Sequence, residues 1–357
     1  MESFKELKVN PLPVPTWHWL KVNDADIKVL DEGVISANES VIRSDKLRTG
    51  TSFTEDEYRS LESGMGREFS EYGYKVSANT VSLSSDDPKQ PEEAIINLSY
   101  EGGRSYFNSY RIEAKDNCEL TVIMRYNKAC DSDPSSEFKA GTDTRVFVGK
   151  NAKVTLLQVE EAENAEIYNN IASYIEDGGS FEVIQLVLCG KKMYNGIATE
   201  LMGKKSRHTI NTGYVGLPDS KLDFNYVARH NGVECTTDMN INGVLHKKSE
   251  KCLRATVDFI TGARGAKGAE KEDVLLLDDN VINKTVPLIL CTEEDVEGEH
   301  GATIGKLSDE VLFYLNTRGI DKDLAYKLLA SGRILTVARM IENEEIRNDL
   351  ISKIDAE

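Results

Sequence analysis

The sequence lacks the patterns that mark metal-binding, exported and membrane proteins. None of its cysteines forms a Cys-x-x-Cys pair, which structural zinc sites and ferredoxin-type clusters normally contain. No apolar run approaches the roughly 20 residues that span a bilayer, and residues 1–15 lack the basic-then-apolar pattern of a signal peptide. We therefore expect a cytoplasmic protein, in which scattered cysteines are mostly small buried hydrophobic residues. The six cysteines are Cys118, Cys130, Cys189, Cys235, Cys252 and Cys291.

Basic residues are fewer than acidic residues. The chain has 43 Lys and Arg against 60 Asp and Glu, a formal net charge of −17. A surface that acidic repels phosphate backbones, so we expect no nucleic-acid partner. The hydrophobic fraction of 40% and charged fraction of 29% are typical of a globular protein. A chain of 357 residues can form one large domain or two to three smaller ones.

Nucleotide-binding and hydrolase motifs are incomplete. Residues 301–307, Gly-Ala-Thr-Ile-Gly-Lys-Leu, are one residue short of a Walker A loop and lack its Ser/Thr magnesium ligand. The glycines of residues 262–268 have no strand-to-helix context for a dinucleotide fingerprint. No Gly-x-Ser-x-Gly elbow occurs either. A serine hydrolase of that type therefore has no support, and any ATP must be handled by another subunit.

Residues 78–305 alternate between apolar and polar side chains, in short stretches separated by Gly, Asn and Asp. Every second residue of 253–259 is apolar, for example, and polar residues fall between them. Such alternation predicts strands with one buried face, and turns with small residues recur before them, as at 149–152 and 177–180. The loose repeat fits either a β-sandwich or a parallel β-helix. The lack of long helices disfavours a doubly wound α/β fold.

The two ends of the chain have different patterns from the centre. Residues 1–77 are predicted to be mostly helical or irregular, with Thr54 as the N-cap of a helix. Trp17 and Trp19 are expected to dock this segment onto the main body, because each can bury a large area. Residues 306–357 predict three amphipathic helices with good capping residues.

Two segments near the C-terminus resemble the signature of the SufB/SufD family of iron–sulfur cluster assembly proteins. They are residues 299–305, Glu-His-Gly-Ala-Thr-Ile-Gly, and 312–320, Leu-Phe-Tyr-Leu-Asn-Thr-Arg-Gly-Ile. The N-terminal Pro-Thr-Trp-x-Trp segment is similar to the SufD branch. The resemblance implies a mainly β fold, a right-handed parallel β-helix flanked by N-terminal and C-terminal helical domains. At about 22–25 residues and about 4.8 Å per coil, the β region would form nine or ten coils.

The same resemblance implies partners. It implies pairing with SufB along the β-helix and docking of the SufC ATPase on the C-terminal helices. Proteins of the SufB branch carry a Cys-Asp-Ser segment upstream of the family histidine, and residues 272–274 here are Glu-Asp-Val. The cysteine thought to hold the nascent cluster is absent, which favours the SufD branch and implies that the chain builds no cluster alone. Leu288 stands where the family often has Glu.

Other interpretations stay open. The chain could be a single-component, SufB-like scaffold that works as a homodimer with an ATPase, or a homodimer only when isolated. A β-helix enzyme acting on carbohydrate is the third alternative. Such enzymes are usually exported, so the missing signal pattern counts against it.

His300 is the chief candidate for the site. A neutral imidazole binds iron or zinc and titrates near physiological pH, although from spacing alone a histidine that caps the last strand is the better interpretation. The resemblance implies that His300 lies at the SufB interface and contributes to a transient iron–sulfur cluster. Glu299 would orient the ring or supply an oxygen ligand. No cofactor is expected to bind tightly to the chain alone, and the resemblance leaves room for a flavin in the complex.

The predicted SufC-docking residues are Phe313, Tyr314, Arg318 and Gly319. Positions 314 and 318 are four apart and share one face of a helix, and Tyr and Arg are typical anchors of protein interfaces. The simpler alternative for Phe313 is a place in the core. His246 and Cys252 are interpreted as structural, because six residues of strand keep them roughly 20 Å apart.

Overall fold

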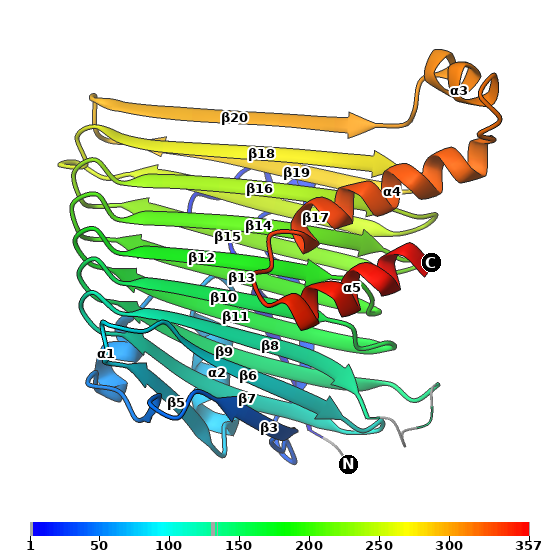
Figure 1. Cartoon of the computed structure of the whole chain (residues 1–357). Helices are drawn as coiled ribbons and strands as arrows, with labels where there is room; N and C mark the ends of the chain where they lie inside the picture. The colour runs from blue at the N-terminus through cyan, green and yellow to red at the C-terminus, as the bar shows by residue number, and fades with distance from the viewer. Residues whose placement is uncertain (1–2, 130–132, 134, 357) are drawn as a thin grey trace.

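Two long β-sheets form the body of the protein in the computed structural model, which describes residues 3–129, 133 and 135–356 (Figure 1). Cys130 lies outside the described residues. We call one of the two sheets the even sheet, with strand order β20-β18-β16-β14-β12-β10-β8-β6-β3. The other is the odd sheet, with order β19-β17-β15-β13-β11-β9-β7-β5-β4. Neighbouring strands are parallel, except that β3 and β4 run antiparallel to β6 and β5.

The strands are mostly eight to eleven residues long in both sheets. Those of the even sheet are β3 (Asn38–Arg43), β6 (Glu92–Tyr100), β8 (Glu119–Lys128), β10 (Lys153–Glu160), β12 (Ser180–Val187), β14 (Arg207–Gly216), β16 (Thr236–Leu245), β18 (Ala266–Leu276) and β20 (Val296–Gly305). Those of the odd sheet are β4 (Arg48–Thr49), β5 (Thr80–Ser85), β7 (Ser105–Ala114), β9 (Phe138–Val148), β11 (Ala165–Ile175), β13 (Lys192–Leu201), β15 (Lys221–His230), β17 (Glu250–Phe259) and β19 (Ile282–Cys291).

Successive strands alternate between the two sheets, so β5 to β20 wind into eight coils of two strands each. The predicted mainly β fold, a parallel β-helix with helices at both ends, is confirmed, and the sandwich alternative is wrong. The prediction of nine or ten coils is also wrong. Long strands make each coil longer than expected: 27 residues separate the paired residues Lys153 and Ser180, and 32 separate Glu250 and Ile282.

Left-handed residues precede strands of both sheets, most regularly those of the even sheet. Each of six even-sheet strands, β8 to β18, begins one or two residues after a residue with φ between 52° and 71°. Asparagine tolerates this conformation and glycine adopts it freely, which explains four of the six residues but not Lys205 and Glu234. The six residues are Asn117, Asn151, Gly178, Lys205, Glu234 and Gly265.

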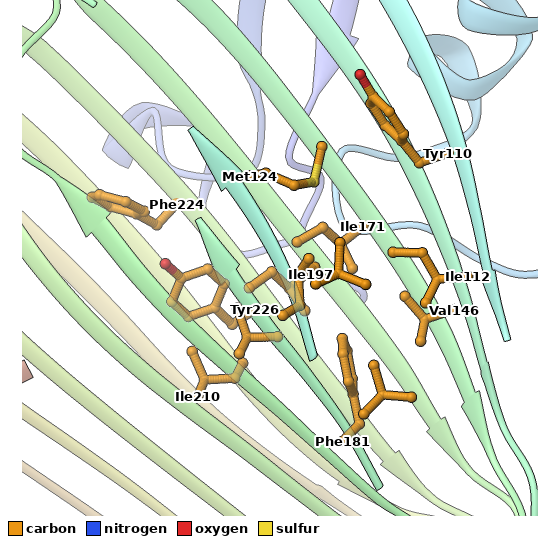
Figure 2. Packing of buried hydrophobic residues seen from close by; sticks show 14 of the residues in the cluster. Tyr110, Ile112, Met124, Val146, Ile171, Phe181, Ile197, Ile210, Phe224 and Tyr226 are labelled. Atoms are coloured by element: carbon orange, nitrogen blue, oxygen red, sulfur yellow. The ribbon is translucent and has the colours of Figure 1, made fainter. Parts of the chain in front are cut away.

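Inward-facing side chains from the two sheets fill the space between them. Figure 2 shows Ile171 and Ile197 of the odd sheet packed among Met124, Phe181 and Ile210 of the even sheet, and all are buried. Residues of one ladder stack on the equivalent residues of the next coil, as Ile171 does on Ile197. Each such buried side chain contributes about 1.5–3 kcal/mol through the hydrophobic effect.

The N-terminal segment covers the outer face of the odd sheet. It contains β1 (Phe4–Val9), the 3-10 helix η1 (His18–Leu20), β2 (Ala25–Leu30), α1 (Glu55–Ser60) and α2 (Arg67–Val76). The predicted helix after Thr54 is confirmed as α1, and its capping box with Glu57 is formed. The antiparallel pair β1–β2 was not predicted from the sequence. Apolar residues of this segment, such as Phe69, pack against Phe107 and Tyr168 of the odd sheet.

The prediction that Trp17 and Trp19 dock the segment is wrong. Their side chains are 73% and 75% exposed. Leu12 and Val22, on either side of them, are buried instead against Cys252 and neighbouring residues of β19. The two tryptophans therefore stand free on a short turn that is anchored from both ends.

The C-terminal helices are α3 (Asp309–Asn316), α4 (Lys322–Ala338) and α5 (Glu344–Ala356). In Figure 1, α4 and α5 lie across the outer face of the even sheet, and α3 lies near the end formed by β20. Residues Val337 and Leu350 of the two helices are buried in one cluster with Leu157 and Leu186 of the sheet. Ser308 and Asp321 cap α3 and α4 through their side chains. Within the described part of the chain, none of the helices is both long and apolar enough to cross a membrane.

Candidate functional site at the open end of the β-helix

The two ends of the β-helix differ. At one end, β3 and β4 pair with the first parallel strands, whereas at the other end β19 and β20 are the outermost strands of their sheets. All side chains from Glu297 to Ile304 of β20 are exposed, although the equivalent inward positions of earlier coils are buried. We call this the open end, because among the described residues no further coil or helix covers it.

Charged residues face the interior at this end. In β18, every second residue from Ala266 to Val274 is buried on the inward face, and two of these residues are Glu270 and Glu272. The parallel register places His300 of β20 opposite Glu270. Side chains opposite each other in a parallel pair lie on the same face of the sheet. His300 therefore shares the inward face with Glu270.

Glu272 belongs to a saturated network. The ammonium group of Lys251 contacts the Glu272 carboxylate and donates to Thr285 Oγ1 over 3.0 Å, and that hydroxyl donates to Glu272 Oε2 over 2.7 Å. The side chains of Lys251 and Glu272 are wholly buried. Burial lowers the pKa of Lys251, against the opposing attraction of Glu272. This buried ion pair is therefore satisfied by its own members and by Thr285 of the outermost strand β19.

The carboxylate of Glu270 is not held by a comparable network. Its side chain is only 6% exposed. Burial is the main cause that raises the pKa of Glu270 to about 7, the charge on Glu272 adds to it, and Lys251 opposes it. No described residue donates a hydrogen bond to its carboxylate. The open end thus holds a buried acid without a partner beside a histidine that is exposed.

The structure does not bring Glu299 together with His300. Glu299 lies opposite Ala269 in the register, and neighbouring residues of a strand point to opposite faces. The side chain of Glu299 therefore lies on the outer face. The acidic neighbour of His300 is Glu270, which sequence reasoning missed. A signal was present: two glutamates at the inward positions of 266–274, where the period-two pattern calls for apolar residues.

The other histidine and cysteine candidates lie away from the open end or are buried, except Cys291. Cys118, Cys235 and Cys252 are buried, and burial raises the pKa of each thiol. His246 lines a hollow of about 740 Å³ between α4 and the even sheet, together with Cys189. Cys291 is exposed at the end of β19. Across the described residues, no three His, Cys, Asp or Glu side chains converge in a way that could hold a metal ion.

The predicted ATPase-docking residues lie on and just after α3. Phe313 and Tyr314 are 73% and 57% exposed, so Phe313 is not part of the core. The guanidinium carbon of Arg318 lies 5.2 Å from the centre of the Tyr314 ring, a cation–π contact. Gly319 follows with a φ of 83° and ends this turn. The four residues therefore form one exposed aromatic and basic surface next to α4.

These features define a parallel β-helix with polar residues on its inward face at one open end. Residues 97–333, well over half of the chain, match the family described as SUF system FeS cluster assembly, SufBD core domain. The chain therefore belongs to the SufBD family of iron–sulfur cluster assembly proteins.

Individual relatives agree with this membership. The chain is 23% identical to the iron–sulfur cluster assembly protein SufD of Bacillus subtilis over 257 residues, which cover 70% of this chain and 57% of that protein. It is 21% identical to SufD of Escherichia coli over 247 residues, covering 69% and 57%. A SufBD family protein of Archaeoglobus fulgidus is 26% identical over 220 residues, covering 61% and 58%. The chain thus spans a little over half the length of these curated relatives.

Proposed function

We propose that this chain is a non-catalytic scaffold subunit on which iron–sulfur clusters are assembled, and that its open end pairs with a chain of the SufB type. The cluster is built between the two chains. A separate ATPase of the SufC type binds the C-terminal helices. The observation that carries the proposal is the uncovered pair of edge strands, β19 and β20, with His300 on the inward face beside them.

Edge strands favour pairing because their free N–H and C=O groups can bond to another chain. At the open end, β20 has a whole row of such groups, and Ile282, Ile289 and Ile304 expose apolar side chains on the two strands. Trp17 and Trp19 add to this surface, since their turn is anchored on β19 through Leu12 and Val22. Trp is enriched among the residues that dominate binding energies.

The location of the cluster follows from the ligands available. Iron takes imidazole, carboxylate and thiolate ligands, and the described residues of this chain bring no three such groups together. The partner must supply the rest, so the cluster is held transiently at the interface. The isolated chain then binds iron only weakly.

The SufC-type ATPase would act on this chain by binding to α3. Phe313, Tyr314 and Arg318 form an exposed surface, and Leu324 and Leu328 of α4 are also exposed. A helix with this much uncovered aromatic surface fits a docking site. We also propose a cytoplasmic location, which suits the buried thiol groups of this chain.

Co-expression with a SufB-type partner tests the pairing. Ile304→Glu, at the open end, should abolish co-elution of the two chains in size-exclusion chromatography, because a charge would be buried in the interface. Ile42→Glu on β3 is the matched control, an exposed isoleucine at the opposite end. Pairing that survives Ile304→Glu and fails with Ile42→Glu would move the interface to the other end. A stable dimer of this chain that excludes the partner would favour the homodimeric scaffold, since a two-fold axis can pair two copies of one edge.

A further inference from the structure

The Glu270 carboxylate accepts no hydrogen bond from a described residue, although the residue is only 6% exposed. The ammonium group of Lys251, whose charge acts on Glu270, is engaged by Glu272 and Thr285. Burying an ionised carboxylate without a partner is costly. A carboxylate placed in this way takes up a proton, carries a penalty in the free chain, or meets a cation that arrives later.

The geometry beside Glu270 favours a cation. Neighbouring strands of a sheet are about 4.8 Å apart, and Glu270 and His300 are directly opposite in adjacent strands on the same face. Their side chains can therefore reach one ion between them. Two residues along the same strand, Glu272 is engaged by Lys251 and Thr285, so the ammonium group of Lys251 is already paired.

We propose that Glu270 and His300 form a two-ligand half-site for Fe²⁺ at the open end, with water and the partner chain completing the coordination. This inference rests on the proposed function and adds Glu270 as a ligand. One carboxylate and one imidazole suit a divalent first-row ion such as Fe²⁺. The carboxylate supplies a negative charge, which a neutral histidine lacks, and so offsets part of the charge on the ion.

The experiment is a Co²⁺ titration of the full, untagged chain, followed by visible absorption and by calorimetry. Co²⁺ is used because it is stable in air and its spectrum reports its ligands. We expect weak binding by the wild-type chain, with Kd between about 10 µM and 1 mM. Glu270→Gln and His300→Ala should each raise Kd at least about tenfold, because each leaves a single ligand. Glu299→Gln, on the neighbouring residue but the outer face, should change Kd less than about twofold.

A second readout separates a ligand from a structural residue. Glu270→Gln should leave Tm equal to the wild-type value or higher, because it removes an unpartnered buried charge. Glu270→His, which restores a ligand, should recover part of the Co²⁺ affinity. A structural role predicts the reverse, a lower Tm for Glu270→Gln with unchanged Co²⁺ affinity.

Three results would overturn the inference: no saturable Co²⁺ binding by the wild type below about 1 mM, wild-type affinity in Glu270→Gln, or equal losses in Glu270→Gln and Glu299→Gln. These outcomes differ from a failure of the proposed function. If Glu270→Gln binds Co²⁺ normally while His300→Ala does not, only Glu270 is removed from the site. If the Ile304→Glu complex forms normally, the pairing through the open end fails whatever Glu270 binds.

Discussion

Glu160 provides a direct test of the interior of the β-helix. It ends β10 and is wholly buried between the sheets. Asn169 Nδ2 donates to Glu160 Oε1 over 3.2 Å, and Asn195 Nδ2 donates to Oε2 over 3.4 Å. Neutral amides stabilise a carboxylate less than a cation would. Burial therefore dominates and raises the pKa of Glu160 to about 8, although both amides oppose it.

The effect on stability has a definite sign. Below the ordinary pKa of 4.5, Glu160 is protonated in both the folded and the unfolded chain, so its titration costs nothing. Between pH 4.5 and about 8 the unfolded chain loses the proton and the folded chain keeps it, so the free energy of unfolding falls as the pH rises. At about 1.4 kcal/mol for each unit of pKa, a shift of this size lowers the free energy of unfolding by on the order of 3–5 kcal/mol at pH 8 and above.

Glu160→Gln keeps the shape of the side chain and replaces its titratable carboxyl group with a neutral amide. We expect the variant to gain stability relative to wild type as the pH rises, with a difference at pH 8 on the order of 1–4 kcal/mol larger than at pH 4.5. Urea unfolding at several pH values, followed by circular dichroism, measures it. Glu163→Gln, an exposed acid three residues further on, is the control and should track the wild type. A difference between Glu160→Gln and wild type that stays constant from pH 4.5 to 8 would refute this interpretation of the buried acid.

Three further predictions concern partners and ATP. The purified chain should not hydrolyse ATP, and turnover that follows this protein through ion exchange would contradict that. Arg318→Ala should weaken binding of the SufC-type ATPase by about 1–3 kcal/mol with the circular dichroism spectrum unchanged, and equal affinity in a titration would remove Arg318 from the interface. The double variant Trp17→Ala/Trp19→Ala should weaken pairing with the SufB-type chain without lowering Tm, because both side chains are exposed in the free chain. A large fall in Tm would mean that the tryptophans stabilise the fold instead.

The sequence predicts the strands and turns well, and the reasons are local, whereas the choice of a β-helix over a sandwich came from the family resemblance. Alternation such as that of 253–259 repeats through the central region, and many of the turns before strands contain an Asn or Gly with positive φ. Thr54 and Ser308 mark their helices because capping depends only on neighbouring residues. These features need no knowledge of which strand lies beside which.

Contacts between coils were harder to predict. Glu270 and His300 meet because of the register between β18 and β20, and that register depends on turn lengths that vary from coil to coil. The tryptophan prediction failed for a related reason. A large apolar residue is expected to be buried, but Leu12 and Val22 occupy the available surface beside β19 and leave Trp17 and Trp19 outside.

The most direct test of a cluster built at the open end uses His300→Ala in the reconstituted complex with the SufB-type chain and the ATPase. Visible absorbance of the assembled cluster is measured on complex whose composition has been checked by light scattering, with His246→Ala as the control. We predict intact pairing, normal cluster yield with His246→Ala, and at least about a tenfold loss with His300→Ala. If His300 only caps the last strand, its loss would cost roughly 1 kcal/mol of stability and leave the cluster yield unchanged. A normal cluster yield from an intact His300→Ala complex would contradict the proposed site.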